Sequence, residues 1–528
     1  MIFCFIRLSL LHNITHMPRR VRVRFAPSPT GPLHIGGVRT ALFNYLFAVK
    51  HKGDFILRIE DTDQGRFVPG AEEYIVNSLK WLGLYYNEGP DKGGPHTPYR
   101  QSQRSELYRQ YAESLIASGN AYYAFDEPEM LEKIRKQYES EGKTFQYDNS
   151  TRMMMRNSLT LSHAETTNLL ETGAAHVIRF KMPENAEVTV KDLIRGEVSF
   201  QTALLDDKVL FKADGLPTYH LANVTDDYLM EITHVIRGEE WLPSLPLHVL
   251  LYRALGWENV MPEFAHLPLI LKPNGQGKLS KRDGDKMGFP VFPLQWTDPY
   301  IGEVSSGYRE SGYFPEAVIN ILAFLGWNPG TEREIYSLCE LADDFSLERV
   351  GKSGSHFDPD KAKWYNQQYL KAMTDSDLAA LFIPVVQSQG HPVQLDYLKK
   401  IAALIKERLT FPHEFWEQAS FFFEPPAAYD MQMAKKIWKE DTHRIILEVK
   451  TMILALQHFT ASTLEALINK YVNEQNIGFG KIATPLRLLV VGSGTGPHLF
   501  DIMDMLGKDE TLRRIETGVD KVTAALAM

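Results

Sequence analysis

The stretch RFAPSPTGPLHIGG (Arg24–Gly37) decides how the first part of the chain folds. The residues RVRVRF that lead into it (20–25) alternate in polarity and are rich in valine, which predicts a β-strand. The three prolines that follow have no backbone N–H for a sheet, so the strand ends before them. In VRTALFNYLFAVK (38–50) the apolar residues recur at the spacing of one helical face. The sequence therefore predicts a strand, a glycine-rich turn and a helix.

This turn places a helix N-terminus at the edge of a sheet. The first N–H groups of a helix are free, and the positive end of the helix dipole favours an anion there. Gly36 and Gly37 let a phosphate approach the backbone, and His34 adds a side-chain donor. The alternative is a purely structural turn with a hydrogen-bonded histidine, and a pattern this short does not decide between the two.

A second glycine-rich stretch, GQGKLSKRDG (Gly275–Gly284), predicts a loop. It holds three cations, Lys278, Lys281 and Arg282. A mobile loop with three positive charges suits the neutralisation of a pyrophosphate in a transition state. A basic surface loop with no ligand is the alternative.

Carboxylates follow the next predicted strand. In GDFILRIEDTD (Gly53–Asp63), residues 55–59 predict a buried strand, and Glu60, Asp61 and Asp63 come directly after it. Side chains at the carboxyl end of a parallel strand point into the ligand crevice of an open α/β sheet. A solvated acidic turn is the alternative.

The segment Gly215–Trp241 offers complementary groups. Tyr219 and Asn223 are four residues apart and share one face of a predicted helix. The strand after that helix ends at Arg237. A guanidinium binds a carboxylate with two hydrogen bonds and discriminates against a neutral amide, although a packed tyrosine and a surface ion pair are the alternatives.

Composition limits the class of protein. With 528 residues the chain is too long for one core, so several domains are expected. A net charge of −9 gives no overall basic signal for nucleic acid but allows a local basic groove. Two cysteines, Cys4 and Cys339, allow neither a disulfide framework nor a cysteine zinc site, which fits a reducing cytoplasm. No apolar run approaches the roughly 20 residues that span a membrane.

The residues PSPTGPLHIGG (27–37) resemble the His-Ile-Gly-His signature of class I aminoacyl-tRNA synthetases in its glutamyl form, with Gly37 in place of the second histidine. The residues KLSKR (278–282) resemble the Lys-Met-Ser-Lys-Ser loop of the same enzymes, with Leu279 and Arg282 as departures. Both signatures stand in the family's order. The resemblance implies that glutamate is activated by ATP with magnesium and transferred to the tRNA for glutamate; the tRNA for glutamine stays open as a second partner.

The resemblance also implies roles for individual residues. The expected catalytic residues are His34, Lys278 and Lys281. The expected ATP-binding residues are His34, Gly36, Gly37, Lys278, Ser280, Lys281 and Arg282. The expected glutamate-binding residues are Arg24, Ala26, Ser28, Glu60, Tyr219, Asn223 and Arg237. In KERLTF, Arg408 is expected to read an anticodon base, with an exposed helix arginine as an equal alternative.

The expected fold is a doubly wound parallel-sheet (Rossmann-like) catalytic domain with an inserted acceptor-binding domain, followed by an all-α anticodon-binding region. Residues 1–16 are expected to be a non-functional extension before Met17, with a targeting peptide as the alternative. The other expected parts are 17–100 and 215–288 for the two catalytic halves, 101–214 for the insertion, 289–356 for a stem-contact linker and 357–528 for the anticodon-binding region. The proline-rich residues 289–308 are expected to be a surface elaboration.

Further expectations concern metal, assembly and rival functions. The stretch AYYAFDEPEM (121–130) has no cysteine where some relatives carry a zinc hook, so no zinc is expected. A monomer is the family expectation. The stretch Leu486–Met503 resembles a strand, a glycine turn and a helix of a cofactor-binding methyltransferase, but we assign it to the anticodon region, since too few residues follow it. Rival functions are a glutaminyl-tRNA synthetase, a tRNA-modifying relative and a non-enzymatic tRNA-binding paralogue.

Overall fold

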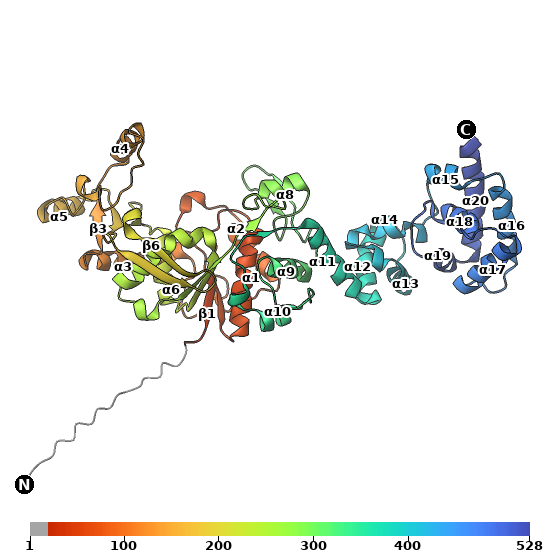
Figure 1. Ribbon diagram of the computed structural model, residues 1–528, viewed down its shortest axis with the longest axis horizontal. Coiled ribbons are helices and arrows are strands. Elements are labelled where there is room, and N and C mark those ends of the chain that lie inside the picture. The colour runs from red at the N-terminus through yellow and green to blue at the C-terminus, as the bar shows by residue number, and fades with distance from the viewer. Residues whose placement is uncertain (1–18, 528) are drawn as a thin grey trace, which may run out of the picture. The chain divides into compact units, whose positions relative to one another are not determined.

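The computed structural model describes residues 19–527, except the side chains of Lys281, Arg282 and Asp285 (Figure 1). The expected extension 1–16 lies outside the described residues. The chain divides into two compact units. Of the described residues, 19–311 and 315–359 form unit 1, and 312–314 and 360–527 form unit 2.

Unit 1 is built on parallel strands. β1 (Arg22–Phe25) pairs with β2 (Asp54–Leu57) in parallel, and β8 (His234–Gly238) pairs in parallel with β9 (Glu263–Leu267). β1 lies beside β8, where the N–H of Thr233 donates to the carbonyl of Arg22 over 2.9 Å. The hairpin of β5 (Glu187–Asp192) and β6 (Gly196–Gln201) extends this sheet, because β5 runs parallel to β9.

Helices cover both faces of this sheet. α1 (Ile35–Lys50) packs on β1, β2 and β8, and Asn44 from its buried face donates to the carbonyl of Ile236. Val235 and Phe264 belong to a separate core with α3 (Ser105–Ala117), α6 (Tyr219–Leu229) and α7 (Leu245–Ala254). α2 (Ala71–Trp81) follows β2 in the chain. The expected doubly wound α/β fold is confirmed.

The segment between the two halves forms its own small sheet. β3 (Ala121–Ala124), β4 (Val177–Phe180) and β7 (Val209–Phe211) are antiparallel. α4 (Pro128–Ser140) and α5 (His163–Glu171) lie between β3 and β4 in the chain (Figure 1). The β5–β6 hairpin of the same segment joins the large sheet instead.

The expectation of a surface elaboration at 289–308 is wrong for the buried part of that segment, about half of its residues. It follows β10 (Ile270–Leu271) and α8 (Lys281–Met287), and it folds into a short hairpin of β11 (Trp296–Thr297) and β12 (Val304–Ser305). Val291, Phe292 and Trp296 are buried, whereas residues 299–304 around Ile301 are exposed, as are Gln295, Thr297 and Ser306. The apolar residues of the segment pack on the signature turn and α2, and the sequence did not indicate this packing.

The rest of unit 1 contains α9 (Pro315–Phe324), α10 (Leu338–Asp344) and β13 (Ser355–His356), which pairs with β10.

Unit 2 is helical around one apolar core. Its helices are α11 (Pro359–Ala372), α12 (Asp375–Ser388), α13 (Leu395–Ile405), α14 (Phe415–Ala419), α15 (Met431–Ile437), α16 (Thr442–Ala455), α17 (Ala461–Glu474), α18 (Gly480–Val491), α19 (Leu499–Leu506) and α20 (Lys508–Ala527). The strand that LRLLVV (486–491) resembles is not formed, because these residues end α18 with Gly492 at φ +88° as its C-cap. The methyltransferase alternative therefore loses its first element. Among the described residues, no helix is long and apolar enough to cross a membrane.

Candidate active site

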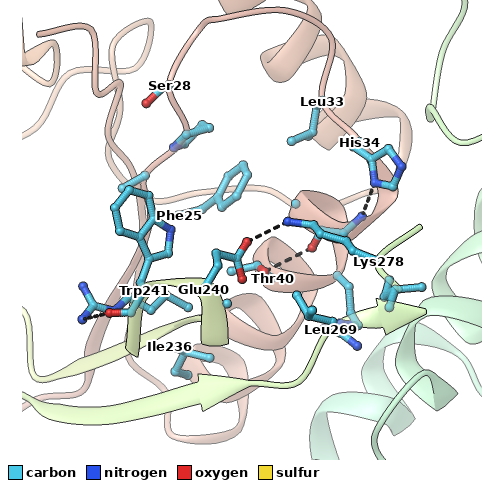
Figure 2. A pocket seen from close by; sticks show the side chains of 18 of the residues that line it. Phe25, Ser28, Leu33, His34, Thr40, Ile236, Glu240, Trp241, Leu269 and Lys278 are labelled. Carbon is cyan, nitrogen blue, oxygen red and sulfur yellow. Dashed lines mark hydrogen bonds and ion pairs between the residues drawn. The ribbon is translucent and has the colours of Figure 1, made fainter. Parts of the chain in front are cut away.

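A cavity of about 510 Å³ opens where β1 and β8 end, between the turn before α1 and the loop before α8. Figure 2 shows His34 and Trp241 on opposite sides of this pocket, with Glu240 and Lys278 between them. Twelve of the expected site residues line it. They are Arg24, Ala26, Ser28, His34, Gly36, Gly37, Glu60, Tyr219, Asn223, Arg237, Lys278 and Ser280. The side chains of Lys281 and Arg282 lie outside the described part of the chain.

His34 is the N-cap of α1. Its Nδ1 accepts a hydrogen bond from the N–H of Gly36 over 3.1 Å. Burial, together with the charge of Lys278, lowers the pKa of His34 to about 4, so the ring is neutral at pH 7. A neutral imidazole whose Nδ1 accepts carries its proton on Nε2. That Nε2 is buried and has no hydrogen-bond partner among the described residues, so it is an unsatisfied donor beside the pocket.

Gly37 packs closely against the preceding part of the signature turn. A Cβ on Gly37 would stand 2.6 Å from Cδ1 of Leu33, so a larger residue would displace that side chain. The turn is also held in place by residues of segment 289–308. The N–H of Ile35 donates to the carbonyl of Val291 over 3.0 Å, and the ring of Phe292 meets the imidazole of His34 edge-on at 6.1 Å. Segment 289–308 thus fixes the helix end that faces the pocket.

The second signature reaches the same pocket. The backbone of Lys278 forms an isolated antiparallel β-bridge with Leu271 of β10. Its side-chain Nζ lies 3.1 Å from Oε1 of Glu240. Ser280 caps α8 through a reciprocal pair with Asp283. Glu240 was not expected from the sequence. Its carboxylate holds the ammonium group of Lys278 in the pocket, and an anionic ligand would bind the same ammonium group.

The acidic end of the pocket is formed by Glu60 and Asn223. Oε1 of Glu60 accepts from Asn223 over 3.1 Å and from Arg58 over 3.0 Å. Burial raises the pKa of Glu60, and the charges of Arg58 and Arg24 oppose that shift. Oε2 has no hydrogen-bond partner among the described residues, which suits it to an ammonium group.

Arg24 lines the pocket, but its charge is already matched. Its Nε and Nη2 bind the two carboxylate oxygens of Asp227 over 3.0 and 3.2 Å. Asp61, of the same acidic stretch as Glu60, instead accepts from the N–H and hydroxyl of Ser102. Asp63 is exposed and pairs with Arg66. Of the three carboxylates after β2, only Glu60 lines the pocket.

Arg237 presents the opposite charge and is 5% exposed. Its Nη1 donates to the hydroxyl of Tyr219 over 3.0 Å and to Nδ1 of His248 over 3.2 Å. The hydroxyl of Tyr219 accepts this bond, so its own hydrogen is available to a ligand. Nη2 reaches the carbonyl of Trp241 only at 3.4 Å. Together, Nη2 of Arg237 and the hydroxyl of Tyr219 offer two donors to a carboxylate.

Three residues that line the pocket or contact Arg237 beside it gave no signal in the sequence. His248 lies within the apolar α7, and His266 lies within β9. Arg39 is buried in α1 and donates to the carbonyls of Leu325 and Pro268. Burial lowers the pKa of Arg39 to about 10. Nothing in one-dimensional spacing relates these residues to the pocket, because each is brought there by a different element.

Arg408 belongs to unit 2 and lies in a short 3₁₀ turn (Lys406–Arg408) after α13. Its side chain is exposed, and Arg487 of α18 is near enough for the two charges to interact. Burial and the charge of Arg408 lower the pKa of Arg487. Neither guanidinium makes an ion pair with a carboxylate among the described residues. As for metals, no cluster of three or more histidine, cysteine, aspartate or glutamate side chains occurs among the described residues.

The family model for the catalytic domain of class I tRNA synthetases (E and Q) matches residues 20–364. A second model, for an anticodon-binding domain, matches residues 377–519, which include Leu486–Met503. The doubly wound fold and the two signature loops at one pocket are therefore those of a class I tRNA synthetase.

Comparison with relatives identifies the branch of the class I tRNA synthetases to which the chain belongs. The chain is 56% identical over 503 residues to the glutamate–tRNA ligase of Flavobacterium johnsoniae, which covers 95% of this chain and 99% of that protein. It has the same identity and coverage with the glutamate–tRNA ligase of Phocaeicola vulgatus. A crystal structure of a glutamate tRNA ligase from Elizabethkingia meningosepticum in complex with its amino acid matches with a TM-score of 0.92 at 50% identity, over 95% of this chain and 100% of that one. The chain belongs to the glutamate–tRNA ligase family.

Proposed function

We infer that this protein is a glutamate–tRNA ligase that activates L-glutamate with ATP and transfers it to the tRNA for glutamate. One observation carries the inference. A single pocket brings together a helix N-terminus with an imidazole donor, the lysine loop and a buried guanidinium, and this guanidinium has no carboxylate partner within the described part of the chain. These groups match a triphosphate at one end and an acidic side chain at the other.

The activation step needs no protein nucleophile. The α-carboxylate of glutamate attacks the α-phosphate of ATP, and pyrophosphate leaves to give glutamyl-adenylate. Nε2–H of His34 and the free amides of α1 stabilise the charge that develops on the phosphate. Lys278, with Lys281, neutralises the leaving pyrophosphate, and Lys278 exchanges Glu240 for that anion. Magnesium arrives with ATP as part of the substrate.

Glutamate is held at both ends. Glu60 and Asn223 receive its ammonium group, and Ala26 and Ser28 line the same wall. Arg237 and Tyr219 receive the side-chain carboxylate. The side-chain NH2 of glutamine would face the N–H of Arg237 and the O–H of Tyr219, which are also donors. Glutamine therefore binds less well than glutamate.

Transfer requires tRNA at two places. We propose that the segment 101–214 holds the acceptor end. A cavity of about 380 Å³ there is lined by Arg109, Lys212, His176 and Tyr123, which are cations and rings of the kind that bind unpaired RNA. We propose that the helical region 357–528 binds the anticodon with Arg408. A monomer in the cytoplasm stays a prediction.

The test is charging of two transcripts, tRNA for glutamate and tRNA for glutamine, with labelled glutamate, ATP and magnesium. We expect the tRNA for glutamate to be charged. Charging of both transcripts would show a dual-specificity enzyme, and charging of neither would refute the proposal. The same assay with labelled glutamine tests the glutaminyl alternative. ATP consumption excludes a non-enzymatic tRNA-binding protein.

A further inference from the structure

Arg237 differs from most other buried arginines of unit 1 in having no carboxylate within ion-pair distance among the described residues. Arg22, Arg24, Arg58, Arg104 and Arg152 each make an ion pair with an aspartate or glutamate. Arg39 also makes none, but its two hydrogen bonds go to backbone carbonyls. Arg237 instead contacts neutral acceptors, mainly on side chains.

The acceptor for Nε of Arg237 is part of a chain of hydrogen bonds. Nε donates to Nε2 of His266 over 3.0 Å. Nδ1 of His266 lies 2.7 Å from Oδ2 of Asp192. Because an ionised carboxylate only accepts, Nδ1 carries the proton, and Nε2 of His266 is left to accept from the arginine.

Asp192 is itself held in place. Its Oδ1 accepts from the N–H groups of Ile194 and Arg195, each over 2.9 Å, and its Oδ2 also accepts from the N–H of His266. His266 is 0% and Asp192 1% exposed. Burial lowers the pKa of His266 against the opposing effect of Asp192, so the imidazole is neutral at pH 7.

We propose that Asp192 and His266 are positioning residues that aim the guanidinium of Arg237 and thereby set the preference for glutamate over glutamine. This inference rests on the proposed function of Arg237. The arrangement fixes the plane of the guanidinium, while His266 separates the carboxylate of Asp192 from it. The positive charge therefore stays directed at the pocket, where a direct aspartate partner would neutralise it.

The arrangement also explains why the β5–β6 hairpin joins the large sheet. Asp192 is the last residue of β5 and pairs in register with Phe264, two residues before His266 on β9. Pairing of these strands brings the carboxylate to the imidazole. A segment that belongs to the insertion in sequence thus contributes a group to the amino-acid end of the pocket.

The first variant is Asp192→Asn. The amide NH2 of asparagine, in the place of Oδ2, would donate a hydrogen bond to Nδ1 of His266. The imidazole proton would then move to Nε2. Nε2–H would face the Nε–H of Arg237, so two donors would oppose each other. We expect the KM for glutamate to rise about 10- to 100-fold and the preference for glutamate over glutamine to fall by a similar factor. The KM for ATP should stay within about twofold, and kcat at saturating glutamate should change less than KM.

Two further variants keep the proposal falsifiable if Asp192→Asn folds poorly. His266→Leu removes both hydrogen bonds, whereas His266→Gln can accept from Arg237 and donate to Asp192. We expect His266→Gln to recover a large part of the loss seen in His266→Leu. Thr189→Ala, at an exposed position of β5, is the matched control and should behave as wild type.

The measurement is aminoacylation of the tRNA for glutamate by the full chain, with glutamate and glutamine varied separately. Wild type that fails to use glutamate would refute the proposed function itself. If wild type is active but the variants keep the KM for glutamate and the glutamate preference, the positioning role is wrong. An equal loss of kcat for every substrate with unchanged KM would also overturn it, since that is a folding defect. Nitrogen-15 spectra of labelled histidine, with His266→Gln for assignment, should show His266 protonated at Nδ1 only; protonation at Nε2 would contradict the proposal.

Discussion

At the scale of single residues, some charged side chains of the pocket are paired with an opposite charge and others are not. Arg24 and Glu60 are both expected ligand-binding residues, yet Arg24 is paired with Asp227, while Glu60 keeps one oxygen free of hydrogen bonds to the described residues. Among the described residues, neither Arg237 nor His34 makes an ion pair. The unpaired groups at the pocket are therefore the imidazole donor of His34 and the guanidinium of Arg237, which the proposed function assigns to ATP and to glutamate.

His34→Ala tests the phosphate end. Losing one donor to the developing phosphate charge should lower ATP–pyrophosphate exchange, measured with tRNA present, by about 10²-fold or more. The effect should lie mainly in the rate, because the donor acts in the transition state. A near-normal rate in this variant would contradict the assignment.

The protonation state of His34 makes a separate prediction. Its pKa of about 4 lies below the ordinary value of 6.5, so the free enzyme has a neutral imidazole throughout pH 6–8. The ratio of kcat/KM for ATP between wild type and His34→Ala should therefore be constant over that range. A ratio that falls on one side of pH 6.5 would show that the imidazole titrates at its ordinary pKa.

At the scale of elements, the segment 289–308 changes the interpretation of the signature turn. Tyr74 of α2 exchanges hydrogen bonds with both backbone groups of Leu294, and its ring meets Trp296 at 5.3 Å. Gly284 of α8 packs so closely on this segment that a Cβ would stand 2.6 Å from Val291. The segment thus contacts the first signature, the second signature and α2 within unit 1.

Phe292→Ala tests this bracing. Removing the ring that meets His34 lets the helix end and the imidazole shift, and small displacements of catalytic groups are costly. We expect pyrophosphate exchange to fall about 10- to 100-fold. Ile301→Ala, at the 73% exposed tip of the same segment, is the control and should leave the rate unchanged. Equal rates in the two variants would mean that the segment has no such role.

At the scale of the whole molecule, the pocket and the proposed anticodon-reading arginine belong to different units. Every residue of the 510 Å³ pocket belongs to unit 1, and the pair of Arg408 and Arg487 belongs to unit 2. Recognition of the amino acid and recognition of the anticodon should therefore be separable by mutation.

Arg408→Ala should separate them. Loss of a base contact by one arginine costs about 1–3 kcal/mol, so the KM for tRNA should rise about 5- to 150-fold. The KM values for glutamate and ATP should not change. Lys470→Ala, on an exposed face of unit 2, is the matched control. If Arg408→Ala matches this control, the anticodon assignment is wrong.

Unit 1 should also lose stability in acid. Burial lowers the pKa of His234 to about 4, whereas an unfolded chain has a histidine pKa near 6.5. The unfolded state therefore binds protons first as the pH falls below about 6.5, and the free energy of unfolding decreases down to about pH 4. His234→Gln should reduce this loss by about 1 kcal/mol at pH 5.5, measured by urea unfolding at pH 7.5 and 5.5. An unchanged pH dependence would contradict the lowered pKa.

The sequence by itself determined the strand–turn–helix at Arg24–Gly37, the two signature loops, and the helix face shared by Tyr219 and Asn223. These are local features, because glycine, proline and the spacing of apolar residues act within a few positions of the chain. The family and the overall fold followed from them.

Only the tertiary structure decided the partners of the pocket residues. Asp192, His248 and His266 lie on three different elements, and no spacing relates them to Arg237. The buried role of 289–308 and the helix in place of a strand at 486–491 were likewise decided by packing. The physical reason is the same in each case: a short apolar or polar run fits several structures, and the surface buried against distant segments selects one of them.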